Sequence, residues 1–580
     1  MSEAEKKADS DEIVGIPVDA ELIIKGKQIR NDISGIKLIQ PINDHHELKL
    51  NIHSRGELET GKDLAEDVSE FTAFLGESLS LTITPFDPKA DGNMKMQFVG
   101  VVTNVEVSNS VGGLDAVTIY AKSPTILMDA AKNNAFFYDQ KPSDIAGSIV
   151  RNYSITPGNT DTAGSTMKYC VQYRETDYDF ACRLASNAGL FAFYDGNKFH
   201  MTKKGVAESV ELVWRQTLGK FTFKWGTVPA AFSSDIYQYE DKSNLTHESD
   251  AASSKAALSN ISKISADASK KLYDKSGYFE VEQKASDAKA LEAAIGAAQG
   301  SAMGGMISCN GISEAPNVTV GHRIQVSGMA NFNGQYLVLS VVHTVTEKGH
   351  YHNTFKCCPL DLAHTQLKSR RKSTAYLQSA EVVDVADPEQ LGRIKVKFSW
   401  NEKEETVWIR MAFPHAGGDH GWYSIPEIGD EVLVGYQQGS PDRPIVLGAL
   451  YNGSNAPASE VVGDENMVKG FITKSGNKII IDDTDGEEKI SIVATDGTQV
   501  LLNSKDPSVT VETSGDITLK GNNITLQADS KIALEGGQIE FTSSGDLKAE
   551  ASMNMNLKGG IEQKIEGTMV TIKGTPIQLN

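Results

Sequence analysis

The last ninety residues, 491–580, carry short apolar pairs that recur every seven or eight residues. Within each pair the two apolar residues are two positions apart, so they lie on one face of an extended strand. Glycines that suit tight turns stand between many of the pairs. The pairs are Val509/Val511, Ile517/Leu519, Ile524/Leu526, Ile532/Leu534, Ile539/Phe541, Leu547/Ala549, Met555/Leu557, Val570/Ile572 and Ile577/Leu579.

This period constrains how many chains the fold requires. A single-chain β-helix needs about twenty residues or more for each turn, because three short strands and their corners must enclose its core. Seven or eight residues make only one side of such a triangle, and two further copies on a threefold axis are the simplest source of the other two. We therefore predict an intertwined trimeric β-prism. The predicted core residues are Val509, Val511, Ile517, Leu519, Ile524, Leu526, Ile532, Leu534, Ile539 and Phe541. A meander of antiparallel hairpins is the alternative.

Composition narrows the class of protein further. The net charge of −20 argues against a nucleic-acid partner held through backbone phosphates. Five cysteines, an odd number without Cys-x-x-Cys spacing, indicate reduced thiols in a cytosolic product. Residues 1–12 are charged and lack an apolar core, so we expect no signal peptide, and no apolar run approaches the length of a membrane span.

The N-terminal half alternates strand patterns with short helices. Residues 17–51, 79–107 and 116–121 read as strands of a modest β-barrel. A helix is predicted over 142–153, and a second begins at Thr176, whose hydroxyl can cap it with Asp179 three residues on. Gly189 is placed to end this helix. A hairpin over 190–199 is predicted to turn at Asp195 and Gly196.

The middle of the chain changes composition. Residues 243–286 are rich in Ser, Ala, Asp and Lys, which indicates a mobile or helical surface region. Residues 285–302 are Ala-rich and favour helix, and 317–346 return to strands. Four basic residues, Lys368, Arg370, Arg371 and Lys372, suggest a solvated linker.

Beyond the linker, the sequence resembles a known family. Segments 380–400, 407–410, 425–436 and 440–453 resemble the OB-fold of the valine–glycine repeat protein G (VgrG) family, the type VI secretion spikes related to contractile phage tail hubs and needles. Residues 169–184 resemble the hub signature of the same family. Two features depart from the family: Ile and Leu dominate the needle repeats here, and 243–286 has no evident counterpart.

The resemblance implies a mainly β protein with a defined domain order. The expected parts are a leader (1–13), a hub of β-barrels with helical insertions (14–370), an OB-fold (376–455), a neck (456–490) and the prism needle (491–580).

The resemblance also implies a set of partners. It suggests a homotrimer on a hexameric tube protein, baseplate contacts, effectors or their adaptors, and a PAAR-like tip protein. The tip protein is expected at the open apolar end of the prism, formed by Val570, Ile572, Ile577 and Leu579. The spike would be cytoplasmic before firing and then delivered into a target cell.

No catalytic or cofactor motif is present. Gly-x-Ser-x-Gly, His-Glu-x-x-His, P-loop and dinucleotide fingerprints are all missing, so we predict no enzyme and no cofactor. Two clusters could supply metal ligands: His350 with His352, and His415 with Asp419 and His420. We expect a surface loop at each and assign no metal site.

Two other functions fit parts of the pattern. The same architecture would serve a phage tail or an extracellular injection particle. A single-chain β-solenoid enzyme acting on polysaccharide would need carboxylates gathered along one groove, whereas the acidic residues of the repeat are spread along it.

Overall fold

The computed structural model describes residues 15–29, 32–53, 69, 71–86, 94–110, 113–249, 258–281, 287–365, 374–401 and 403–578. The chain divides into two compact units, residues 1–456 and 457–580. The expected leader, the basic linker at 368–372 and Leu579 lie outside the described residues. No helix in the described part is long and apolar enough to cross a membrane.

The first unit begins with a closed β-barrel. Its strands pair in the ring β20-β3-β4-β7-β6-β5-β1-β21, and β21 pairs back to β20. Alternate side chains such as Leu22, Ile24, Leu48 and Leu50 fill the interior, as the sequence pattern predicts. The strands are β1 (Ile16–Ile24), β3 (Asp32–Pro41), β4 (Glu47–His53), β5 (Ser78–Pro85), β6 (Met96–Ser110), β7 (Gly113–Lys122), β20 (Gly334–Val345) and β21 (His350–Pro359), with β2 (Lys27–Ile29) beside β1.

A second barrel shares two of these strands. Its sheet runs β13-β19-β20-β21-β18-β14, and an isolated bridge between Trp214 and Leu218 joins its two edges. Its own strands are β13 (Ser209–Val213), β14 (Leu218–Trp225), β18 (Ile307–Ser313) and β19 (Arg323–Ser327), with short 3-10 turns η2 (Ala330–Phe332) and η3 (Leu360–Leu362). The separate apolar core of this barrel confirms that the hub contains two barrels.

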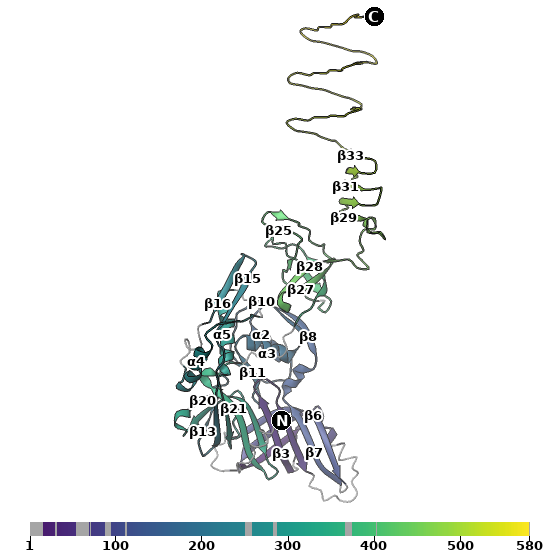
Figure 1. Cartoon of the computed structure of the whole chain (residues 1–580). Coiled ribbons are helices and arrows are strands. Elements are labelled where there is room, and N and C mark those ends of the chain that lie inside the picture. The colour runs from purple at the N-terminus through teal and green to yellow at the C-terminus, as the bar shows by residue number, and fades with distance from the viewer. Residues whose placement is uncertain are drawn as a thin grey trace. The chain divides into compact units, whose positions relative to one another are not determined.

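A layer of helices and short strands joins the barrels to the OB-fold. Figure 1 shows α2 and α3 between the barrel strands and strands β27 and β28. Thr176 caps α3 by accepting a hydrogen bond from the Asp179 backbone N–H, and Gly189 follows the helix with φ +73°, both as predicted. The layer contains η1 (Pro124–Asp129), β8 (Lys132–Gln140), α2 (Pro142–Val150), β9 (Pro157–Thr160), β10 (Met167–Thr176), α3 (Asp177–Asn187), β11 (Phe191–Tyr194) and β12 (Phe199–Thr202).

The region of unusual composition forms a small packed insert. A three-stranded sheet, β16-β15-β17, packs on α5 around Ile236, Val281, Leu291 and Ile295. The expected helical surface appears in α4, whereas β16 is a strand within 243–286; residues 250–257 and 282–286 lie outside the described part. The elements are β15 (Phe232–Gln238), β16 (Ser243–Glu248), α4 (Asn260–Leu272), β17 (Gly277–Tyr278) and α5 (Ala288–Gly304).

The OB-fold segment forms a small five-stranded barrel. Its order is β23-β22-β27-β28-β24, and the isolated bridge between Ile394 and Ile409 connects the two ends of this sheet. The strands are β22 (Gln378–Asp384), β23 (Lys395–Phe398), β24 (Arg410–Met411), β27 (Glu431–Tyr436) and β28 (Pro444–Leu450), with the outlying hairpin β25 (Ala416–Gly417) and β26 (His420–Gly421) and the 3-10 turn η4 (Gln437–Gly439).

The second unit is an antiparallel ladder followed by open chain. After η5 (Ser459–Val461), the strands pair in sequence order: β29 (Val468–Ile472), β30 (Lys478–Asp482), β31 (Lys489–Val493), β32 (Gln499–Asn503) and β33 (Ser508–Glu512). The ladder therefore starts inside residues 456–490, the segment expected as a neck. Its strands form an antiparallel meander, which is the arrangement given above as the alternative to the prism. From 513 to 578, the described chain contains no helix or strand, and Figure 1 shows that it follows a zigzag path.

Candidate functional site

The strand ladder of the second unit presents an apolar face without a covering layer. Ile479 lies opposite Ile492, which in turn lies opposite Val500, and Val500 lies opposite Val511. A parallel row runs beside it through Ile481, Ile490, Leu502 and Val509. Directly opposed residues of an antiparallel pair project to the same face, so the two rows form one continuous apolar surface. Most of these side chains are exposed in the single chain.

The predicted prism core continues this surface. All ten predicted core residues are between 49% and 69% exposed, so one chain does not bring them into a core. Of the predicted tip residues, Val570, Ile572 and Ile577 are also exposed, and Leu579 lies outside the described residues. Soluble monomers rarely leave so many large apolar side chains in a row without cover. In the single chain, the apolar surface of the second unit is therefore open to solvent.

A second feature is the joint between the hub and the OB-fold. Phe136, Val171 and Tyr173, from hub strands β8 and β10, are buried in the same core as the OB-fold residues Val382 and Phe398. Hub strands thus complete the core of the neighbouring domain. The hub signature contains two of these residues, but their role in the OB-fold core has no local signal in the sequence.

Polar contacts fix this joint. The Val171 backbone N–H donates to the Asp442 carboxylate at 2.6 Å. The Gln378 side-chain amide donates to the Tyr173 hydroxyl at 3.1 Å, while its oxygen accepts from the Trp400 indole at 2.7 Å. These bonds satisfy polar groups that the packing removes from water, and they set the register of one domain on the other.

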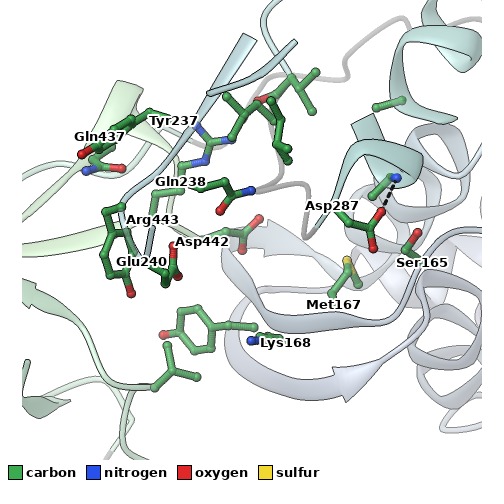
Figure 2. A pocket seen from close by; sticks show the side chains of 18 of the residues that line it. Ser165, Met167, Lys168, Tyr237, Gln238, Glu240, Asp287, Gln437, Asp442 and Arg443 are labelled. Carbon is green, nitrogen blue, oxygen red and sulfur yellow. Dashed lines mark hydrogen bonds between the residues drawn. The ribbon is translucent and has the colours of Figure 1, made fainter. Parts of the chain in front are cut away.

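A cavity of about 1140 Å³ lies beside the joint, between the insert and the OB-fold. Figure 2 shows Tyr237, Gln238 and Glu240 of the insert facing Asp442 and Arg443 of the OB-fold. The remaining labelled side chains are Ser165, Met167, Lys168, Asp287 and Gln437; Asp287 accepts the hydrogen bond that begins α5.

Charges on the cavity wall are held by fixed partners. Arg393 donates to Asp387 at 2.7 Å, and the guanidinium of Arg410 stacks over the ring of Tyr239 at 4.6 Å. Burial would raise the pKa of Asp387, but the hydrogen bonds from Arg393 and nearby backbone groups lower it to about 2. Arg393 and Arg410 are therefore fixed by contacts that serve the structure, and we assign no chemistry to this cavity.

One buried cluster has the order of a catalytic triad. Asp129 lies 2.7 Å from His45 Nε2, and His45 Nδ1 lies 2.8 Å from the Thr125 hydroxyl. Thr125 is buried, and the adjacent Ser123 hydroxyl accepts from the His46 backbone N–H. Because neither hydroxyl reaches solvent, no substrate can approach, and the cluster braces the turn between β3 and β4 against η1.

The sequence offers two groups of possible metal ligands, His350 with His352 and His415 with Asp419 and His420. His350 and His352 lie in strand β21, not in the surface loop expected there, and they share its partly exposed face, as their spacing predicts. His415 and His420 lie 5.2 Å apart between ring centroids on the exposed β25–β26 hairpin, and Asp419 occupies its turn with φ +58°. Among the residues that the structure describes, no three His, Cys, Asp or Glu side chains gather into a metal-binding group.

Comparison with known proteins gives two family matches. Residues 378–451 match the type VI secretion system/phage-baseplate injector OB domain, and residues 55–349 match the phage tail baseplate hub (GPD). The first match confirms the OB-fold that the sequence predicts. The second covers just over half of the 580 residues.

Curated relatives and a solved structure agree with these matches. The chain is 24% identical to the type VI secretion system spike protein VgrG1c of Pseudomonas aeruginosa over 73% of its own length and 62% of that protein. It is 22% identical to the actin cross-linking toxin VgrG1 of Vibrio cholerae over 65% of its length and 36% of the toxin. The chain thus spans about three fifths of the first relative.

The fold is similar to the E. coli c3393 protein, a type VI secretion component, with a TM-score of 0.50, 14% identity and coverage of 74% of this chain and 99% of that one. The structure contains two barrels that share strands and an attached OB-fold barrel, and the hub family matches residues 55–349. The chain belongs to the phage tail baseplate hub (GPD) family.

Proposed function

We propose that this chain is the homotrimeric spike of a type VI secretion apparatus, mounted on its tube and driven into target cells to puncture the envelope and deliver effectors. The family membership, the OB-domain match and the spike relative support this proposal. The relative's name describes that protein, and the chain spans only part of it.

The observation that carries the proposal is the uncovered apolar face of the second unit. Burying an Ile, Leu or Val side chain stabilises a protein by about 1.5–3 kcal/mol relative to leaving it exposed. The two apolar rows contain Ile490 and Ile492, and the apolar pairs beyond Val511 continue them. These side chains would be stabilised by burial if they faced other chains. In a trimer with a threefold axis, the apolar face of each copy is buried in the same way, and the three copies form a closed prism.

The hub supports the same symmetry. Each chain supplies two barrels that share β20 and β21, so a trimer presents six barrels in a ring. Such a base suits a hexameric tube protein and the baseplate around it. At the other end of the prism, the exposed Val570, Ile572 and Ile577 suit a PAAR-like tip protein, and effectors or their adaptors would travel with the assembly.

We propose a structural rather than an enzymatic role for the chain. The triad-like cluster at His45 is sealed, and two arginines of the cavity beside the OB-fold, Arg393 and Arg410, are held by Asp387 and Tyr239. One relative is an actin cross-linking toxin, and the match covers 36% of it. A role in carrying such activities is therefore consistent with this chain, and none of its described residues is assigned to catalysis.

The test is the solution mass of the purified protein, measured by light scattering after gel filtration. A trimer has about three times the chain mass of 62.7 kDa. The double variant Val509→Asp/Val511→Asp places charges on the apolar face and is expected to weaken the trimer and expose the rod to protease. Thr510→Asp, on the opposite face of the same strand, is the matched control and should leave both unchanged.

A well-folded monomer would contradict the proposal and favour the single-chain solenoid. A trimer encoded beside capsid genes would instead favour a phage tail, whereas sheath and membrane-complex genes without capsid genes favour type VI secretion.

A further inference from the structure

Two cysteines of the second barrel face each other across neighbouring strands. Cys309 in β18 lies directly opposite Cys357 in β21, which is antiparallel to it. Opposed residues of an antiparallel pair project to the same face of the sheet. The alternation agrees: Ile307 and Cys309 point inward on β18, as Phe355 and Cys357 do on β21. Both thiols are buried in one core cluster.

The other three cysteines lack this relationship. Cys358 follows Cys357 along the strand and lies opposite Leu337 of β20. Cys170 belongs to the core of the first barrel, and Cys182 is on α3 and packs against that same core. The register therefore selects one pair from the five thiols.

The geometry of an antiparallel pair fits a disulfide. Opposed residues have Cα atoms about 4.5–5.5 Å apart, and disulfides join residues whose Cα atoms are about 4.4–6.8 Å apart. The native register of β18 and β21 is therefore compatible with a disulfide between these two residues. In the reduced protein, burial and a hydrogen bond with Cys309 raise the pKa of Cys357 well above its usual value, which keeps Cys357 in the unreactive thiol form.

We propose that Cys309 and Cys357 are a redox-sensitive pair that closes into a cross-strand disulfide when the protein meets a disulfide oxidant such as glutathione disulfide. One thiolate attacks a sulfur of the oxidant, which forms a mixed disulfide and releases one glutathione thiol. The second thiolate attacks the protein sulfur of that mixed disulfide and releases the second glutathione. Two protein thiols are oxidised to one disulfide, and one glutathione disulfide is reduced to two glutathione thiols, which take up the two protons that the protein thiols lose.

The position gives the bond a structural consequence. β21 belongs to both barrels, and a link to β18 would tie the second barrel to the strand it shares with the first. The bond would close a long loop of chain, which restricts the unfolded state and raises stability. Both thiols are buried, so the oxidant reaches them only when the hub transiently opens, and we expect oxidation over hours rather than minutes. This inference does not depend on the proposed function.

The test uses the full-length protein in glutathione disulfide, followed by unfolding, alkylation of remaining thiols and peptide mass mapping. The expected result is a chain lighter by two hydrogen atoms, with Cys309 and Cys357 protected from alkylation and the melting temperature raised by several degrees. Cys357→Ala should abolish the mass change and the rise in melting temperature. Cys358→Ala, one residue along the same strand, is the matched control and should preserve both.

Other outcomes would overturn the proposal. Five alkylated cysteines after prolonged oxidation show that the pair does not react in the folded protein. A bond from Cys309 to Cys358, or glutathione adducts without an internal bond, shows that the register does not direct the chemistry. The mapping on the wild-type chain decides the question even where an alanine variant folds poorly.

Discussion

The carboxylate of Asp442, in the loop before β28 of the OB-fold, accepts a hydrogen bond from the backbone N–H of Val171, in hub strand β10, at 2.6 Å. The two residues are 271 positions apart in the sequence. This bond anchors a strand of one domain at the edge of the core of another. It makes the hub and OB-fold a single structural body, consistent with their shared compact unit.

Replacing Asp442 should weaken this joint. Asp442→Ala leaves the Val171 N–H buried without its acceptor, and hydrogen bonds to charged groups contribute about 1.5–3 kcal/mol. We expect a loss of this size in the free energy of unfolding, measured by urea titration. Asp442→Asn keeps an oxygen acceptor without the charge and should lose less. Equal losses in both variants would show that the bond itself contributes little.

The cap of α3 is a second test. Thr176 accepts from the Asp179 backbone N–H at 3.1 Å and donates to Asp129 at 2.5 Å. Thr176→Val preserves the shape but removes both bonds, and loss of a helix cap costs about 1 kcal/mol. Thermal unfolding should show a lower melting temperature for Thr176→Val, whereas Thr176→Ser retains the hydroxyl and should resemble the wild type. A destabilised Thr176→Ser would point to the methyl group instead.

Buried histidines predict acid sensitivity. The Tyr351 hydroxyl donates to His343 Nδ1 at 2.7 Å, His343 Nε2 donates to the Gln40 side-chain oxygen at 3.0 Å, and the Gln40 amide donates to His46 at 3.3 Å. This chain of bonds requires neutral rings. Burial lowers the pKa of both His46 and His343 to about 3.

The sign follows from proton linkage. Below pH 6.5 the unfolded chain binds protons at both histidines while the folded chain does not, so stability falls as the pH drops from 6.5 towards 3. Two such groups imply a loss of about 3 kcal/mol between pH 6.5 and pH 5. Urea titrations at these two pH values should show a smaller loss for His343→Gln. His420→Gln, on an exposed hairpin, should keep the wild-type dependence.

The exposed apolar residues Ile572 and Ile577 predict where a tip protein binds. The variant Ile572→Asp/Ile577→Asp should abolish binding of a PAAR-like tip protein in a pull-down, because it charges the apolar surface that the tip would cover. The trimer mass should be unchanged, since most of the apolar rows remain. Gln578→Glu is the neighbouring control. Retained tip binding by the double variant would move the docking site elsewhere on the chain.

Metal content tests the two histidine groups. Mass spectrometry of the purified protein should find no stoichiometric zinc or iron, because His350 and His352 offer two ligands where structural zinc takes four. Stoichiometric metal lost in His352→Ala, but retained in His420→Ala, would contradict this and assign the ion to β21.

Local signals in the sequence predicted local structure well. The hydroxyl of Thr176 and Gly189 mark the two ends of α3, and Asp195 with Gly196 forms the turn of the β11–β12 hairpin. In each case a few neighbouring residues determine the backbone, so the pattern is readable from the chain alone. The inward alternation of Leu22 and Ile24 belongs to the same class.

Long-range pairing could not be predicted from such signals. The contact of Ile16 with Tyr351 closes the first barrel, and no local periodicity indicates which strand will lie beside another. The ladder also begins at β29 (Val468–Ile472), within the segment predicted as a neck and before residue 491, where the predicted repeat begins. Ile479/Ile481 and Ile490/Ile492 have the same two-residue spacing but recur after eleven residues, so they do not follow the shorter period of the later repeat.

The strands shared by the two barrels have one more consequence. Because β20 and β21 are each hydrogen-bonded within both rings, neither ring can release them without disturbing the other. We therefore expect local fraying to stop at these strands and their amide protons to exchange with solvent only when the whole hub opens. The hub would then unfold as one cooperative unit with its slowest-exchanging amides at the centre, a property that would suit the force-bearing role proposed for it.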